Sequence, residues 1–298
     1  MTAPATESCT IGVDVGATTI KSAIVDHGVI VGSTTCRTPN GSAKAVEDAI
    51  VESIETLQAQ GLTTGGVGIG TPGWTSADRR TVIYSPNLPW RDEPVAEQVE
   101  ERVQSPVVLE NDANAAAWGE YRFGVARGKS SMIAITLGSG VGGAIVLGGQ
   151  LVRGRDGCAG EIGHTRRESG GRPCACGRSG CMENYVSGRA LLRDGGFGPD
   201  YDCFAAGAAG ETAALAVIAA FGRHLGIGLA DSVLLLNPDV VVIGGAVAES
   251  FALFGKSAAD ALAGELGPNW AGVAPPIVAA TLGSDAGRIG AADLARAT

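Results

Sequence analysis

Four side chains of metal-binding type lie close together in the sequence. The run EIGHTRRESGGRPCACGRSGCME contains His164, Cys174, Cys176 and Cys181. Three thiolates and one imidazole complete the tetrahedral shell of a Zn²⁺ ion and leave no open position for a reacting water. The sequence therefore predicts a structural zinc site rather than a catalytic one.

The cysteine spacing differs from that of common zinc fingers. The gaps between the three cysteines are one and four residues, so the prediction also depends on the nearby histidine and on Gly177 and Gly180, which allow tight turns. The chain has seven cysteines in all, and its first residues do not resemble a secretory signal, which argues against a disulfide framework. We expect free thiols in a reducing cytoplasm. The other cysteines fit small buried side chains; they are Cys9, Cys36, Cys158 and Cys203.

Two carboxylates flank the predicted zinc ligands. Glu161 lies three residues before the histidine, and Glu183 lies two residues after the last cysteine. A metal that fixes its ligands would also fix these neighbours. We expect the zinc segment, residues 161–183, to hold both carboxylates for a polar ligand.

A third acidic group follows a predicted strand at residues 107–110. The run Glu110-Asn111-Asp112-Ala113-Asn114 opens a predicted helix at 113–121. Either Asn111 or Asp112 could therefore be simply the N-cap of that helix. Alternatively, the end of the strand presents Asp112 as a general base that accepts a hydroxyl proton.

Two glycine turns have the composition of anion sites. Backbone N–H groups collected in such turns bind phosphate without a cationic side chain. The candidates are Asp14, Gly16, Thr18 and Thr19 in the first turn and Thr136, Gly138, Ser139 and Gly140 in the second. Asp14 could also place a Mg²⁺ ion, either directly or through water.

The second turn also offers an alternative interpretation. Residues 138–143 match the GxGxxG pattern of a nicotinamide oxidoreductase. That pattern must open a helix, whereas the β-branched run that follows it predicts a strand. We therefore favour the phosphate turn.

The order of predicted elements indicates a duplicated α/β protein. Strands at 10–13 and 20–26 enclose the first turn, and residues 11–25 align with 133–146 around the second. A third strand is predicted at 29–33, and residues 72–94 read as a long irregular segment. Further strands at 66–71 and 240–243 and helices at 43–60, 95–103 and 212–236 complete the pattern. We expect one domain at 1–120, joined by a final helix at 286–298, and a second at 121–285.

Composition excludes two other classes. The net charge of −9 disfavours a nucleic-acid surface. Residues 132–152 carry no charge and are long enough to span a membrane, but their glycines predict two buried strands. We therefore expect a soluble protein.

Several motifs, taken together and in order, resemble the ROK family of sugar kinases and sugar-responsive repressors. They are DVGAT, GIGTPG, SPNLPW, ENDANAAAWGE, TLGSGVGG, EIGH, CACGRSGCME, NPDVVVIGGA and LGSDAGRIGAA. The resemblance implies the actin-like ATPase (ribonuclease H-like) duplicated fold, with two α/β domains flanking a deep cleft. It also implies a homodimer or tetramer.

The resemblance implies roles for individual residues. Asp112 matches the catalytic base, and the residues that match sugar ligands are Asn87, Asn111, Glu161, His164 and Glu183. His164 would also bind zinc, and Gly244 and Gly245 match a segment against the adenosine. At position 17 the family pattern DxGGT has glycine and this chain has Ala17, which would be strained if φ there must be positive.

The resemblance also implies an activity. Repressor members carry a helix-turn-helix domain before the first strand, whereas that strand begins about ten residues into this chain. We therefore expect a cytoplasmic kinase that uses ATP, Mg²⁺ and structural Zn²⁺ to phosphorylate the 6-hydroxyl of glucose. The open alternatives are N-acetylmannosamine, N-acetylglucosamine, fructose or allose as acceptor, polyphosphate as donor, and a non-catalytic sugar sensor.

Overall fold

The computed structural model describes residues 9–62 and 64–296. The chain forms two compact units. Unit 1 contains Met1–Arg127, Arg153–Ala159 and Ser284–Thr298, and unit 2 contains Gly128–Val152 and Gly160–Gly283. The short segment Arg153–Ala159 thus belongs to unit 1, although the chain on both sides of it belongs to unit 2.

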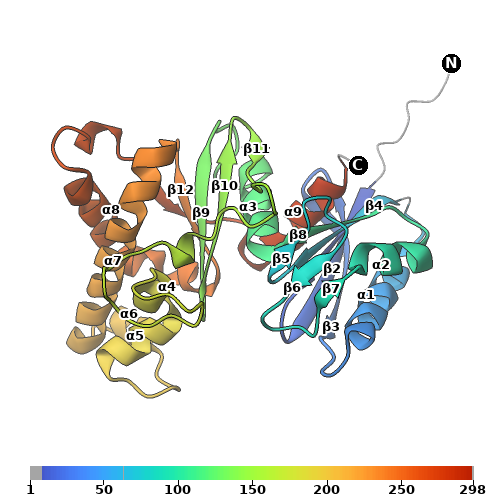
Figure 1. Cartoon of the computed structure of the whole chain (residues 1–298), viewed down its shortest axis with the longest axis horizontal. Coiled ribbons are helices and arrows are strands. Elements are labelled where there is room, and N and C mark those ends of the chain that lie inside the picture. The colour runs from blue at the N-terminus through green and yellow to red at the C-terminus, as the bar shows by residue number, and fades with distance from the viewer. Residues whose placement is uncertain (1–8, 63, 297–298) are drawn as a thin grey trace. The chain divides into compact units, whose positions relative to one another are not determined.

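A five-stranded sheet with the order β3-β2-β1-β4-β8 forms the centre of unit 1 (Figure 1). Strands β1, β2 and β3 pair antiparallel, while β4 and β8 run parallel to β1. The strands are β1 (Cys9–Val15), β2 (Thr19–Asp26), β3 (Val29–Arg37), β4 (Thr64–Thr71) and β8 (Val107–Asn111). Because the parallel strands end at the same edge of the sheet, their carboxyl ends bring together the residues that follow them.

The strand register specifies which residues meet at this edge. Asp14 of β1 pairs with Gly70 of β4, and Gly70 pairs in turn with Glu110 of β8. Thr71 pairs with Asn111. The first predicted anion turn and the predicted catalytic turn therefore start from the same edge of one sheet.

The helices of unit 1 pack against this sheet and against one another. Helix α1 begins after Ser42, whose hydroxyl accepts a hydrogen bond from the N–H of Ala45 at 3.2 Å, which is an ordinary N-cap. Helix α9 packs against β1, β4 and α3. A side chain at Gly12 or Gly68 would collide with the backbone of α9, so glycine at these positions permits the close approach. The helices are α1 (Ala43–Gln58), α2 (Val95–Val103), α3 (Asp112–Arg122) and α9 (Ala286–Ala295).

The prediction of an irregular segment at 72–94 is wrong. The segment contains a small antiparallel sheet of β5 (Trp74–Thr75), β6 (Val82–Tyr84) and β7 (Arg91–Glu93). Its strands are two or three residues long, too short for a period-2 pattern to appear. The fully buried Trp90 anchors the segment, and its indole N–H donates to Glu47 at 3.3 Å.

Unit 2 repeats the strand order of unit 1. Its sheet has the order β11-β10-β9-β12-β13, with the first three strands antiparallel and the last two parallel to β9. The strands are β9 (Met132–Leu137), β10 (Val141–Leu147), β11 (Gln150–Leu151), β12 (Val241–Gly244) and β13 (Ile277–Ala279). The repeat predicted from residues 11–25 and 133–146 is thus present as β1-β2 and β9-β10.

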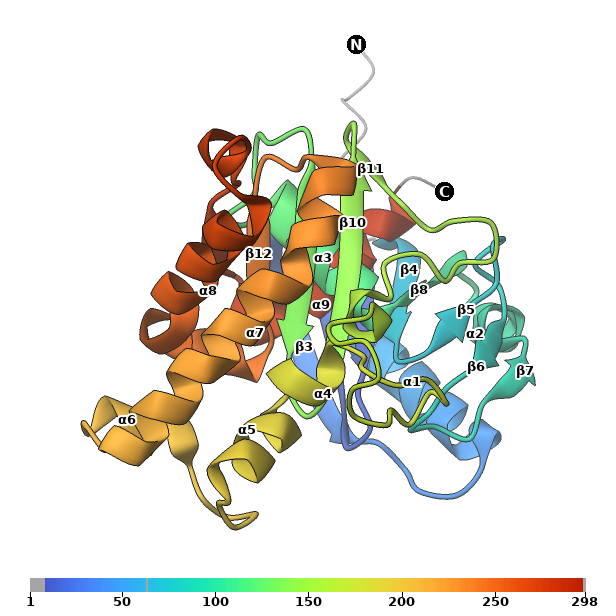
Figure 2. The same ribbon diagram turned by 60° about the vertical axis from the view of Figure 1, so that its left-hand side comes forward.

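Helices α7 and α8 pack side by side in unit 2 (Figure 2). Helix α7 is long and apolar enough to cross a membrane by length and composition alone. However, Phe221, Leu225 and Leu229 of this helix lie in the hydrophobic core of unit 2, so a core helix accounts for its composition. The helices are α4 (Glu183–Val186), α5 (Gly188–Gly195), α6 (Cys203–Ala208), α7 (Thr212–Leu236) and α8 (Phe251–Leu266).

Candidate functional site

The turn at the end of β8 shows which of the two candidate residues caps α3. Asn111 is the N-cap of α3: its Oδ1 accepts from the N–H of Asn114 at 3.0 Å, and its Nδ2 donates to the carbonyl of Gly73 at 3.0 Å. Asp112 is the first residue of the helix, and its Oδ1 accepts from the N–H of Ala113 at 2.8 Å. Because Asn111 already caps the helix, Asp112 is not needed as the cap.

Two carboxylates at this edge have raised pKa values. Burial raises the pKa of Asp14 to about 6, the negative charge of Asp112 adds to the rise, and Lys21 and Arg288 oppose it. Burial likewise raises the pKa of Asp112, against the hydrogen bonds from the backbone. A raised pKa makes a carboxylate a stronger base, which suits a group that must accept a proton near neutral pH.

Turn 1, residues 16–18, joins β1 to β2 and is held from within unit 1. The N–H of Gly16 donates to the carbonyl of Thr19 at 2.9 Å, and the Thr38 hydroxyl donates to the carbonyl of Gly16 at 2.7 Å. Ala17 is not among the described non-glycine residues with positive φ. The backbone at Ala17 is therefore not strained by a positive φ.

Turn 2, residues 138–140, joins β9 to β10 in unit 2. The N–H of Gly138 donates to the carbonyl of Gly140 at 3.0 Å. Gly244 of β12 pairs with Thr136 of β9, and Gly245, with φ of 80°, packs so closely on Leu137 that a side chain would collide with its backbone. The structure therefore brings the predicted second phosphate turn and the predicted adenosine segment to one edge of the sheet.

The chain that follows the predicted zinc ligands supports turn 2. Glu183 accepts a hydrogen bond from the N–H of Val141 at 3.0 Å through Oε2. The N–H of Gly188 donates to the carbonyl of Gly138 at 2.8 Å, and Arg189 Nε donates to the carbonyl of Ser139 at 2.9 Å. Gly188 and Arg189 were not predicted from the sequence, because only tertiary contacts identify them.

The four predicted zinc ligands converge. Their donor atoms all lie within 4.8 Å of one another. The Sγ atoms of Cys176 and Cys181 are 3.6 Å apart, and Cys174 Sγ is 3.8 Å from His164 Nδ1. Two sulfurs bound to one tetrahedral Zn²⁺ lie about 3.8 Å apart, since each Zn–S bond is about 2.3 Å. The residues present therefore fit a zinc ion, which would crosslink the segment.

Glycine turns shape the ligand loop as the sequence predicted. Gly177 and Gly180 have φ of 87° and 78°. The N–H of Gly177 donates to the carbonyl of Cys174 at 3.0 Å, and the N–H of Gly180 donates to the carbonyl of Arg172 at 2.8 Å. These turns bring the ligands on either side toward one another.

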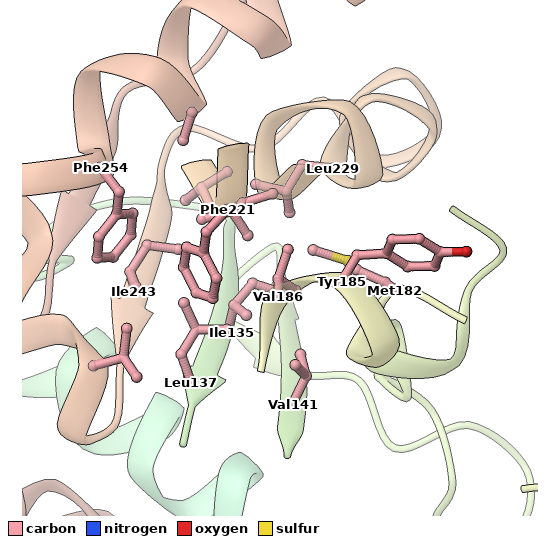
Figure 3. Packing of buried hydrophobic residues seen from close by; sticks show 14 of the residues in the cluster. Ile135, Leu137, Val141, Met182, Tyr185, Val186, Phe221, Leu229, Ile243 and Phe254 are labelled. Carbon is pink, nitrogen blue, oxygen red and sulfur yellow. The ribbon is translucent and has the colours of Figure 1, made fainter. Parts of the chain in front are cut away.

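The loop is anchored in the core of unit 2. Met182, which follows the last cysteine, is fully buried, and Tyr185 and Val186 of α4 lie in the same hydrophobic cluster (Figure 3). Val141, which follows turn 2, belongs to this cluster too. The zinc segment and turn 2 therefore share one packed support.

The remaining predicted sugar ligands are accessible. His164 Nε2 lies 4.0 Å from Glu161 Oε2, so the ring nitrogen that faces away from Cys174 faces a carboxylate. Glu161 is exposed, and Asn87 is exposed between the buried Leu88 and the strand β6. Each of these side chains can still reach a ligand.

Comparison with known proteins now assigns the family. The model of the ROK family matches residues 10–298. The chain belongs to the ROK family. It is 40% identical to the glucokinase of Streptomyces coelicolor over 96% of this chain and 97% of that protein.

Solved structures of ROK proteins share the fold. A ROK glucokinase from Streptomyces griseus, in complex with glucose and AMPPNP, is 39% identical, with a TM-score of 0.85 over 98% of this chain and 100% of that one. The ROK hexokinase from Thermus thermophilus is 35% identical, with a TM-score of 0.84 over 96% and 97%. The actin-like ATPase fold predicted from the motifs is thereby confirmed.

Proposed function

We propose that the chain is an ATP-dependent glucokinase that transfers the γ-phosphoryl group of ATP to the 6-hydroxyl of glucose. The observation that carries the proposal is the position of Asp112. It lies at the carboxyl edge of the unit 1 sheet, beside Asp14, with a raised pKa and with the capping role taken by Asn111. The likeness to glucokinases over nearly the whole chain supports glucose as the acceptor.

Asp112 acts as the general base in this proposal. Its carboxylate accepts the proton of the 6-hydroxyl as that oxygen forms a bond to the γ-phosphorus, and the bond from phosphorus to the bridging oxygen of ADP breaks. Phosphoryl transfer asks little else of the protein beyond alignment and charge neutralisation. A bound Mg²⁺ supplies part of that neutralisation, and Asp14 would hold it directly or through water.

The nucleotide would be bound by backbone groups from both glycine turns. Turn 1 offers Gly16, Thr18 and Thr19, and turn 2 offers its N–H groups with Thr136 and Ser139. Gly244 and Gly245 would lie against the adenosine, since β12 brings them to the same edge of the sheet as turn 2.

The acceptor would be bound by polar side chains that match its hydroxyls. A buried sugar hydroxyl without a partner costs binding free energy, which explains a set of amides and carboxylates; they are Asn87, Asn111, Glu161, His164 and Glu183. One oxygen of Glu183 already binds the backbone at Val141, so its other oxygen would bind the sugar. Zn²⁺ held by His164, Cys174, Cys176 and Cys181 would stiffen this segment.

We further expect a homodimer in the cytoplasm. Sedimentation at several concentrations measures the oligomeric state, and fractionation of the source cells tests the cytoplasmic location.

A coupled assay of ADP release across several hexoses tests the function. We expect the highest kcat/KM with glucose and lower values with N-acetylmannosamine, N-acetylglucosamine, fructose and allose. ATP and polyphosphate are compared as donors at saturating glucose. Glucose binding without ADP release would instead indicate a sugar sensor, and faster turnover of another hexose would reassign the acceptor.

A further inference from the structure

A buried ion pair lies directly behind the turn that carries Asp112. Glu110, the residue two positions earlier, has a side chain that is only 3% exposed. Its Oε2 accepts a hydrogen bond from Arg153 Nε at 2.6 Å, and Arg79 Nε lies 3.8 Å from the same oxygen. One guanidinium group thus hydrogen-bonds to this oxygen, and a second lies at ion-pair distance while its Nε donates to the carbonyl of Leu109. Neither belongs to the site described above.

The other oxygen of Glu110 holds the turn itself. Oε1 accepts from the N–H of Asn111 at 3.2 Å and from Asn114 Nδ2 at 3.0 Å. Asn114 is in turn fixed through its N–H, which donates to Asn111 Oδ1. Glu110 therefore binds residues on both sides of Asp112, and its own position depends on the two arginines.

We propose that Glu110 and Arg153 are positioning residues for Asp112, a step that rests on the proposed function. Glu110 holds residues 111–114 in the conformation that presents the Asp112 carboxylate, and Arg153 holds Glu110. A general base is effective only within hydrogen-bond reach of the proton it accepts, so a small displacement of this turn lowers the rate.

The position of Arg153 in the chain predicts a second effect of losing its ion pair with Glu110. Arg153 opens the segment Arg153–Ala159, which belongs to unit 1 and is followed directly by the zinc segment with Glu161. Release of Arg153 would loosen the stretch that leads into the acceptor residues. Within the part of the chain that the structure describes, Glu110 and Arg153 form no hydrogen bond or ion pair with the turns assigned to the nucleotide. We therefore expect effects on kcat and on the KM for glucose, and none on the KM for ATP.

The first experiment replaces Arg153 by Met in the full-length chain. The Arg153 side chain is 28% exposed, and Glu110 keeps Arg79 as a partner, so the variant should fold. We expect kcat to fall about 10- to 100-fold, as small misplacements of catalytic groups do, with the KM for ATP within about twofold. Arg153→Lys, which keeps the charge, should recover part of the loss. Circular dichroism and the thermal midpoint verify folding at the assay temperature.

A matched control comes from another ion pair of unit 1. Arg80 Nη1 binds Glu100 Oε2 at 2.6 Å, the same distance as Arg153 to Glu110, and Glu100 belongs to α2 rather than to the Asp112 turn. Glu100→Gln should leave kcat within about twofold. An equal loss of kcat in Glu100→Gln and Arg153→Met would mean that loss of any such ion pair slows the enzyme, and the proposal would be wrong.

A double variant tests whether the two residues act together. In Glu110→Gln the new amide cannot accept from Arg153 and from the turn at once, so kcat should again fall. If Arg153 acts only through Glu110, adding Arg153→Met to Glu110→Gln lowers kcat no further. Multiplied losses, or a wild-type kcat in Arg153→Met, overturn the inference. A wild-type chain without ADP release would overturn the proposed function and this inference with it.

Discussion

Turn 1 and turn 2 occupy equivalent places in two sheets of the same strand order, yet different parts of the chain hold them. The Thr38 hydroxyl, directly after β3 of the same sheet, fixes turn 1. Three residues that follow the predicted zinc ligands fix turn 2; they are Glu183, Gly188 and Arg189. The two turns therefore share a position in the sheet and differ in the residues that support them.

The carboxylates near the two turns also differ in what they do. Beside turn 1 lie Asp14 and Asp112, whose burial raises both pKa values. Beside turn 2 the nearby carboxylate, Glu183, serves as a hydrogen-bond acceptor for the backbone. We infer that the proton chemistry lies in unit 1 and that the ligand-binding residues of unit 2 depend on the segment with the predicted zinc ligands. Substitutions in the two units should therefore have different kinetic signatures.

The largest expected effect is that of Asp112→Asn. The amide keeps the size of the side chain but cannot accept the hydroxyl proton, so kcat should fall about 10²- to 10⁴-fold. Glucose affinity, measured by calorimetry, should change little. Asp92→Asn, the same substitution at an exposed aspartate of unit 1, serves as the control. Turnover of Asp112→Asn near the wild-type rate would exclude the proposed mechanism.

Cys176→Ser, in unit 2, should change the KM values more than kcat. Loss of one thiolate should release the zinc, measured as metal content per chain, and raise the KM for glucose. The contacts of Glu183, Gly188 and Arg189 with turn 2 add an effect on the KM for ATP that the sequence did not predict. We expect rises of roughly tenfold, the scale seen when metal support is lost, with a smaller change in kcat.

Cys36→Ser, outside the cluster, is the matched control for the metal variant. It should retain both the metal and the wild-type KM values. Full zinc content in Cys176→Ser would contradict the crosslink, and a change confined to the KM for glucose would contradict the link to turn 2.

The dependence of activity on pH tests the proposed role of Asp14 in unit 1. A carboxyl whose pKa is raised to about 6 is protonated below that pH, so Asp14 loses the charge with which it would hold Mg²⁺. We expect kcat/KM for ATP to fall about tenfold per pH unit below 6, whereas an ordinary carboxyl would hold its charge down to about pH 4. A profile of kcat/KM that stays flat down to pH 5 would remove Asp14 from this role.

The smallest expected effect is that of Ala17→Gly. Because Ala17 does not require positive φ, glycine there should only loosen the unfolded chain and lower the free energy of unfolding by about 0.4–1 kcal/mol. The KM for ATP should stay within twofold. Gly245→Ala, at φ of 80°, is the contrasting variant and should weaken ATP binding clearly. A large gain in ATP affinity from Ala17→Gly would show that the alanine does impair turn 1.

Local patterns predicted much of the fold. The helix expected at 212–236 is α7 with the same bounds, because its 25 residues repeat apolar positions over many turns. The strands on either side of each glycine turn were also predicted. The strands β5, β6 and β7 were missed, since pieces of two or three residues have no period to detect.

Local patterns could not decide which atoms meet at the site. The sequence left Asn111 and Asp112 as equal candidates for the cap, and Asn111 took that role because its amide also reaches Gly73 from another segment. Glu183 was predicted to bind only sugar, and the structure adds its contact with Val141. Each of these outcomes depends on a residue more than 35 positions away in the chain.

The sequence by itself determined the chemical inventory of this protein. The sequence contains a Cys₃His set, two glycine turns and an acidic residue at a strand end, and these depend on residue type and short spacing along the covalent chain. Only the tertiary structure decided the supports: Arg153 behind Glu110, Glu183 beneath turn 2, and His164 Nδ1 toward Cys174. Such contacts join distant segments, so the packing of whole sheets and helices selects them, and no local pattern records that selection.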